Sequence, residues 1–231
     1  MARTLVIGDL HLPAHHPGYL QFCLDLYDQW NCDTTVFIGD VVDLHSISFH
    51  EKELDTPNPI EEYELSMEAL VEWRDAFPKA YVTIGNHDER VHRKAKATGI
   101  PSHYLKSYSE LYGTPKWTWC QDVTIDDVHY WHGTGRSGIA PARNAAISSM
   151  MSTVIGHCHS VAGLHWIVGP NRRVFGMDTG CGVDPDHPAM RYGAQLKSRP
   201  VIAAGVVIDG IPYHEICPTG RGELYNRSNF A

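Results

Sequence analysis

Four short segments place carboxylate, amide or imidazole side chains directly after an apolar run that ends in glycine. Such runs are typical of buried parallel strands, and ligands of open α/β sheets bind at the carboxyl ends of strands. Aspartate, asparagine and histidine supply the oxygen and nitrogen ligands that divalent metals take in proteins. We therefore expect one metal-dependent site where the four strand ends meet. The segments are Asp9-Leu10-His11, Asp40-Val41-Val42-Asp43, Asn86-His87-Asp88 and His157-Cys158-His159.

This set of residue types suits a pair of metal ions that hydrolyse a phosphate ester. Two divalent cations about 3.5–4 Å apart neutralise the phosphate, lower the pKa of a shared water and orient an in-line attack. Such a pair needs mixed oxygen and nitrogen ligands and one carboxylate able to bridge. Its candidate ligands here are Asp9, His11, Asp40, Asn86, His132, His157 and His159. For His132 the simpler alternative is a packed histidine at the end of an ordinary strand.

The spacing within two of the segments makes a further prediction about direction. Asp9 and His11 are two residues apart, as are His157 and His159. In extended backbone, residues two apart share a face. Cys158 would then point the other way, and we expect it to be a buried structural thiol rather than a ligand.

Alternating helical and strand patterns predict one mixed α/β domain over residues 1–231, with C-terminal strands within 161–217 and a polar tail over 218–231. Loops are expected at 44–59 and 178–186, and Asp209-Gly210 is typical of a two-residue hairpin turn. The four segments above follow strands at Thr4–Ile7, Thr35–Ile38, Tyr81–Ile84 and Thr153–Ile155. Further strands are expected at Lys116–Cys120, Val123–Ile125, Val128–Trp131, Gly163–Val168, Arg173–Met177, Val201–Ile208 and Ile211–Ile216. The expected helices are Gly18–Trp30, Ile60–Phe77, Asp88–Ala97, His103–Tyr112 and Pro141–Met151.

The motifs, taken in order, resemble the calcineurin-like metallophosphoesterase superfamily, in particular its bacterial and phage members. They are Asp9-x-His11, Gly39-Asp40-x-x-Asp43, Gly85-Asn86-His87-Asp88, His132-Gly133 and Gly156-His157-x-His159. The resemblance implies a sandwich of two mixed β-sheets packed face to face, with helices on both outer sides. It also implies a dinuclear centre of transition metals (Mn, Fe, Zn, Co or Ni), for which we favour Mn.

The resemblance also implies a role for each residue. Asp9, His11, Asp40 and His159 would hold the first metal ion, and Asp40 would bridge to the second. The second ion would take Asn86, His132 and His157. A metal-bridging hydroxide would be the nucleophile. His87 would protonate the leaving-group oxygen or contact the phosphoryl oxygen, and Asp43 would orient it.

The class of phosphate ester depends on a departure from the superfamily pattern. Protein phosphatases of this superfamily usually continue the second motif with an arginine and a glycine, and the arginine binds the phosphate. This chain has Leu44 and His45 there. Because a diester carries less charge than a monoester, we expect a phosphodiesterase. Arg136 or Arg90 as a substitute arginine would favour a monoesterase or protein phosphatase, and His45 is a third candidate for substrate contact.

A non-catalytic scaffold with the same fold is the alternative from another class, but such proteins typically lose metal ligands, and none is missing here. The formal charge of −8 gives no general attraction to nucleic acid, so a nucleotide or nucleic acid is only one of the open substrates. Six cysteines without a Cys-x-x-Cys pair indicate a reducing compartment. With no signal peptide visible and no apolar run of about 20 residues, we expect a cytoplasmic protein without a membrane partner.

Overall fold

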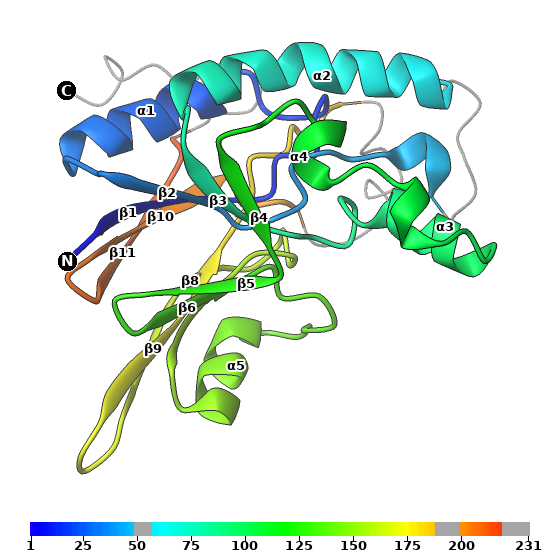
Figure 1. Ribbon diagram of the computed structural model, residues 1–231. Helices are drawn as coiled ribbons and strands as arrows, with labels where there is room; N and C mark the ends of the chain where they lie inside the picture. The colour runs from blue at the N-terminus through cyan, green and yellow to red at the C-terminus, as the bar shows by residue number, and fades with distance from the viewer. Residues whose placement is uncertain (49–56, 188–198, 219–231) are drawn as a thin grey trace.

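Two β-sheets packed face to face form the centre of the computed structural model, which describes residues 1–48, 57–187 and 199–218 (Figure 1). The larger sheet has the order β11-β10-β1-β2-β3-β4, with β1 to β4 parallel and β10 antiparallel to both β1 and β11. Its strands are β1 (Arg3–Ile7), β2 (Thr34–Phe37), β3 (Ala80–Thr83), β4 (Trp117–Cys120), β10 (Ala203–Ile208) and β11 (Ile211–Ile216).

The smaller sheet has the order β5-β6-β7-β9-β8, in which β6, β7 and β9 are parallel and the two outer strands are antiparallel to their neighbours. Both sheets are therefore mixed, as the sequence predicts. The strands of this sheet are β5 (Asp122–Ile125), β6 (Val128–Trp131), β7 (Ser152–Ile155), β8 (Ala162–Val168) and β9 (Arg173–Thr179).

Helices cover the outer face of each sheet (Figure 1). On the larger sheet lie α1 (Tyr19–Gln29) and α2 (Pro59–Ala76), and on the smaller sheet lies α5 (Pro141–Ser149). The remaining helices are α3 (Arg90–Ala97), α4 (Tyr108–Leu111) and the 3₁₀ turns η1 (His45–Ile47) and η2 (Ser102–Tyr104). The expected helix–sheet–sheet–helix sandwich is confirmed. None of the helices within the described ranges is long and apolar enough to cross a membrane.

Strand alternation divides the core into two layers. Leu5 and Ile7 of β1 belong to the core under α1 and α2, together with Trp73. Val6, between them, belongs to the core between the sheets, with Tyr130 among its members. Burying apolar residues on both faces of β1 and β2 fixes the positions of their carboxyl ends, where Asp9 and Asp40 follow.

The packing of α5 depends on a glycine in β9. A Cβ atom on Gly176 would lie 2.4 Å from the backbone oxygen of Ala142, so only glycine lets the helix approach the sheet this closely. The helix start is held from β9 as well, because the Asp178 carboxylate accepts hydrogen bonds from Ala142 N at 3.1 and 3.3 Å. This acceptor compensates for Ala140 at the N-cap, which makes no side-chain cap bond.

Beyond shifts of one or two residues at the ends of elements, the sequence predictions differ from the structure in three places. The single helix expected over 103–112 is η2 followed by α4, because Ser107 and Glu110 form a capping box that starts a new helix. The loop expected at 44–59 contains η1, and α2 already begins at Pro59, behind the N-cap Asn58. Strand β9 extends into the loop expected at 178–186. Residues 49–56 of the first loop and 219–231 of the expected tail lie outside the described residues.

Candidate metal centre

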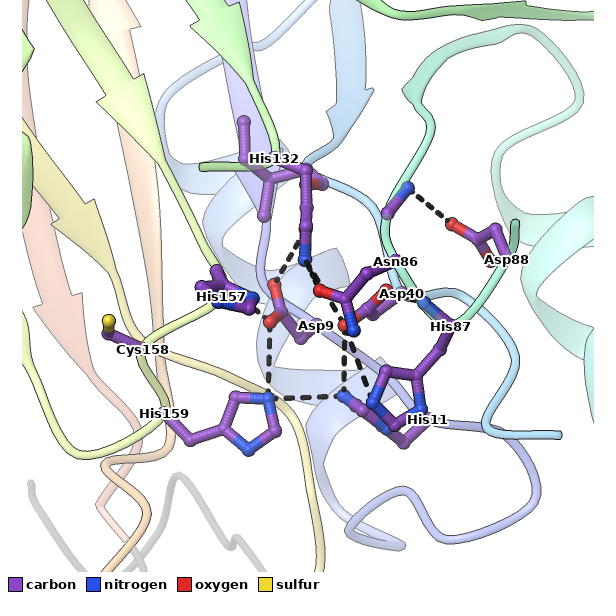
Figure 2. A network of polar contacts seen from close by, with 12 residues as sticks. Asp9, His11, Asp40, Asn86, His87, Asp88, His132, His157, Cys158 and His159 are labelled. Atoms are coloured by element: carbon purple, nitrogen blue, oxygen red, sulfur yellow. Dashed lines mark hydrogen bonds and ion pairs between the residues drawn. The ribbon is translucent and has the colours of Figure 1, made fainter. Parts of the chain in front are cut away.

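The strand ends of both sheets deliver their polar side chains to one cluster (Figure 2). From the larger sheet, Asp9 follows β1, Asp40 follows β2, and Asn86 and His87 follow β3. From the smaller sheet, His132 follows β6, and His157 and His159 follow β7. With His11 from the loop after Asp9, all seven candidate ligands predicted from the sequence lie together, and His87 lies beside them.

Three groups within the cluster have the spacing of metal-ligand sets. Each group has its donor atoms within 4.8 Å of one another. His159 Nε2 lies 3.2 Å from Asp9 Oδ2 and 3.1 Å from His11 Nε2. His132 Nε2 lies 3.1 Å from Asp40 Oδ2 and 3.2 Å from Asn86 Oδ1. The groups are Asp9, His11 and His159; His11, Asp40 and His87; and Asp40, His132 and His157.

Hydrogen bonds on the far side of two imidazole rings decide which nitrogen faces the cluster. His132 Nδ1 lies 2.9 Å from the carbonyl oxygen of Ile38, and His11 Nδ1 lies 2.8 Å from Asp43 Oδ1. Because these partners are acceptors, Nδ1 donates in both rings, and the Nε2 lone pair is left for a metal ion. Asp9 Oδ1 is buried without a hydrogen-bond partner, as expected of an atom that ligates an ion. Among the described residues, this donor set fits divalent transition metals.

The electrostatics of the cluster favour a cation. Burial lowers the pKa of His132, but the Asp40 and Asp9 carboxylates outweigh it and raise that pKa to about 10. Burial and the neighbouring His87 lower the pKa of His11 to about 4, so this ring is neutral at physiological pH. Burial opposes the ionisation of Asp40, yet the surrounding histidines hold its pKa well below the usual range. A neutral His11 ring and an ionised Asp40 carboxylate are the forms that bind metals, whereas an ion at His132 would have to displace the proton from Nε2.

The backbone reaches the cluster through tight turns, which corrects one sequence prediction. His11, Asp40 and His157 have positive φ angles of 51°, 48° and 69°. These are left-handed conformations, not the extended backbone that the two-residue spacing suggested. Strain of this kind in residues other than glycine gathers at functional sites. Gly85 leaves the room that Asp40 needs, since a Cβ there would lie 2.1 Å from Asp40 Oδ1.

Beside the cluster, Asp43 contacts two histidines with one oxygen. Its Oδ1 lies 2.8 Å from His87 Nδ1 as well as 2.8 Å from His11 Nδ1. Its Oδ2 is buried without a hydrogen-bond partner. Arg90, at the start of α3, donates to the backbone oxygen of Asp43 at 2.6 Å, and its other terminal nitrogen lies 3.1 Å from His87 Nε2. A ligand candidate, the candidate acid and a cation are thus joined through one carboxylate residue.

The other candidates for substrate contact lie differently. The Arg136 guanidinium lies over the Trp131 ring, 5.8 Å from its centroid, and among the described residues its side chain forms no hydrogen bond or ion pair with the cluster. The backbone nitrogen of His45 donates to Glu62 of α2. Cys158 points away from the cluster, as expected (Figure 2). It is half-buried, whereas the sequence predicted a buried thiol.

Asp88 belongs to one of the sequence motifs, but its positioning role was not predicted. Asp88 is fully buried, and its carboxylate accepts hydrogen bonds from Val41 N at 3.0 Å, Val42 N at 3.3 Å and Gly85 N at 2.9 Å. It therefore ties the loop after β2 to the loop after β3, and both loops carry candidate ligands. The available sequence signal for this role was an acidic residue directly after Asn86-His87. A carboxylate buried at that position needs hydrogen-bond donors around it.

Comparisons with known proteins give one family model and several solved structures that are similar to this chain. The family model of calcineurin-like phosphoesterases matches residues 2–147. No curated protein matches the chain. Similar solved structures include a metallophosphoesterase from Sphaerobacter thermophilus, 17% identical, with a TM-score of 0.49 over 96% of this chain and 90% of that chain. Vps29 from Chaetomium thermophilum is 14% identical, with a TM-score of 0.49 over 95% of this chain and 93% of that chain. The phosphoesterase Yfce from E. coli is 16% identical, with a TM-score of 0.43 over 91% and 90%.

Proposed function

Because the chain belongs to the calcineurin-like phosphoesterase family, we propose that it is a phosphodiesterase that depends on two divalent metal ions. The observation that carries the proposal is the convergence of donors from both sheets. Asp43 turns the Nε2 atom of His11 inward, and the carbonyl of Ile38 does the same for His132. A scaffold has no use for this arrangement, and its strained turns would cost stability without return.

We assign the first ion to Asp9, His11, Asp40 and His159, and the second to Asp40, Asn86, His132 and His157, with Asp40 as the bridging carboxylate. When bound, the two ions would supply charge neutralisation at the phosphate and activation of water. We favour Mn²⁺, because the mixed carboxylate and imidazole set suits transition metals. The substrate would be a cytoplasmic phosphate ester, with nucleotides and nucleic acid among the candidates.

In this proposal, His87 acts on the leaving group. Its ring is held at Nδ1 by Asp43 at 2.8 Å, so Nε2 is the nitrogen able to reach a substrate oxygen. Burial lowers the pKa of His87, but the Asp40 and Asp43 carboxylates outweigh burial and raise it. A raised pKa favours the protonated ring that a general acid requires.

A phosphomonoesterase is the second candidate, and Arg90 is the observation that favours it. Its guanidinium is a cation beside the cluster, and a monoester carries one more negative charge to neutralise than a diester. If Arg90 bound that additional charge, it would replace the arginine that Leu44 and His45 leave out of the second motif.

The test compares bis(p-nitrophenyl) phosphate with p-nitrophenyl phosphate as substrates of Mn²⁺-reconstituted protein. We expect faster turnover of the diester, and its loss in Asp40→Ala, which removes the bridging carboxylate. Asp122→Asn, an exposed substitution on β5, serves as the matched control and should remain active. A preference for the monoester would replace the first candidate by the second, and failure to bind metal would refute both.

A further inference from the structure

Arg90 is a buried cation whose carboxylate partner among the described residues, Asp43, is shared with two histidines. It is 8% exposed, and its nearest carboxylate oxygen, Asp43 Oδ1, lies 4.0 Å from Nη1. That oxygen already contacts both His11 and His87. A buried charge is costly unless it is paired. The site therefore has a positive charge whose natural partner is an anion that arrives from outside.

The two terminal nitrogens of Arg90 have different partners. Nη1 is anchored, because it donates to the backbone oxygen of Asp43 at 2.6 Å. Nη2 lies 3.1 Å from His87 Nε2. Since arginine has no acceptor, this contact requires Nε2 to be the acceptor, and the ring to be neutral. Nη2 carries two hydrogens, so one of them remains for another acceptor beside His87 Nε2.

We propose that Arg90 is a second catalytic residue at the leaving group, where its Nη2 donates a hydrogen bond to the oxygen that departs from phosphorus. The inference rests on the proposed function, because an acid role of His87 requires the leaving oxygen within hydrogen-bond distance of Nε2. Nη2 is a neighbour of that position. When the P–O bond breaks, its electron pair stays on the leaving oxygen. His87 supplies the proton, and Arg90 stabilises the negative charge that develops before proton transfer is complete.

This role differs from that of a phosphate clamp. A clamp binds the non-bridging oxygens, so its loss affects diesters with good and poor leaving groups equally, and it affects the more highly charged monoesters most. A donor at the leaving oxygen matters in proportion to the charge that this oxygen must carry. Its loss is therefore severe for a poor leaving group such as phenol and slight for 4-nitrophenol, whose ring delocalises the charge.

The experiment is a double-mutant cycle of Arg90→Ala and His87→Ala with methyl phenyl phosphate and methyl 4-nitrophenyl phosphate. In the His87→Ala background, we expect Arg90→Ala to lower kcat/KM for the phenyl ester by roughly 10- to 100-fold, the size of a charge-assisted hydrogen bond. The nitrophenyl ester should lose only several-fold. Arg90→Lys, which keeps the charge, should recover part of the loss. Lys96→Ala, an exposed substitution on the same helix, should change neither ester.

Other results overturn the inference. If Arg90→Ala has no further effect once His87 is gone, Arg90 only positions His87. Equal losses for both esters, activity too low to measure on either, or a larger loss on p-nitrophenyl phosphate than on diesters would also contradict a role at the leaving oxygen. Metal content is measured for each variant. Arg90→Ala should bind metal like the wild type, because among the described residues Arg90 contacts none of the assigned ligands. If the wild-type protein hydrolyses no diester at all, the proposed phosphodiesterase function fails, and this inference fails with it.

Discussion

At the scale of single residues, Asp43 links the two halves of the site. One of its oxygens contacts His11, a candidate metal ligand, and His87, the candidate acid. A carboxylate that fixes the ring of a ligating histidine typically changes metal affinity 10- to 100-fold when it is removed. From the sequence, Asp43 was expected to orient His87 alone, because sequence spacing does not reveal that one oxygen contacts two rings.

We therefore expect Asp43→Ala to weaken metal binding by about 10- to 100-fold, in addition to lowering activity. His87→Ala should lower activity while metal binding stays near that of the wild type. Titration of Mn²⁺ into metal-free protein by calorimetry measures both variants. If Asp43→Ala binds Mn²⁺ as tightly as the wild type, the contact with His11 has no role in holding the metal.

At the scale of secondary-structure elements, the sequence predicts much of the arrangement because strand ends are determined by buried apolar runs. Gly8, Gly39, Gly85 and Gly156 mark where those runs end, and the cluster lies there. The left-handed turns at His11 and His157 could not be predicted, since residues other than glycine rarely adopt positive φ. The position of Arg90 was equally hidden. It depends on α3 beginning at Arg90 and not at Asp88, whose carboxylate binds backbone nitrogens instead.

Helix α5 offers a pH-dependent test of how elements are joined. Burial raises the pKa of Asp178, which accepts from the start of α5, from 3.8 to about 7. Between these values the folded protein keeps a proton that the unfolded chain releases, so the free energy of unfolding falls as pH rises from about 4 to about 7. Asp178→Asn keeps the acceptor and cannot ionise. We expect it to match the wild type near pH 4 and to exceed it above pH 7, by up to roughly 4 kcal/mol at about 1.4 kcal/mol per pKa unit.

Urea unfolding at several pH values measures this difference. Asp178→Ala is the matched control, because it loses the acceptor as well as the charge and leaves Ala142 N without its partner. Above pH 7 it should be less stable than Asp178→Asn, by about 1 kcal/mol for a lost helix cap. A constant difference between Asp178→Asn and the wild type from pH 4 to 8 would show that Asp178 does not ionise in this range.

At the scale of the whole molecule, the candidate metal centre connects the two sheets. Asp9 and Asp40 come from the larger sheet and His132, His157 and His159 from the smaller one, so bound ions would cross-link the sandwich. A ligand that binds only the folded state stabilises it by about 2.7 kcal/mol at a concentration 100 times its Kd. For a domain of this size, each kcal/mol of added stability raises Tm by roughly 2–4 °C.

We expect saturating Mn²⁺ to raise the Tm of metal-free protein by about 5–10 °C, measured by scanning calorimetry. Asp40→Ala should lose most of this increase, because Asp40 is assigned to both metal sites, whereas Asp122→Asn, an exposed substitution on β5, should keep it. A Tm that does not respond to Mn²⁺, Zn²⁺ or Co²⁺ in the wild type would mean that the two sheets are held by their apolar core alone and that the cluster binds no ion tightly.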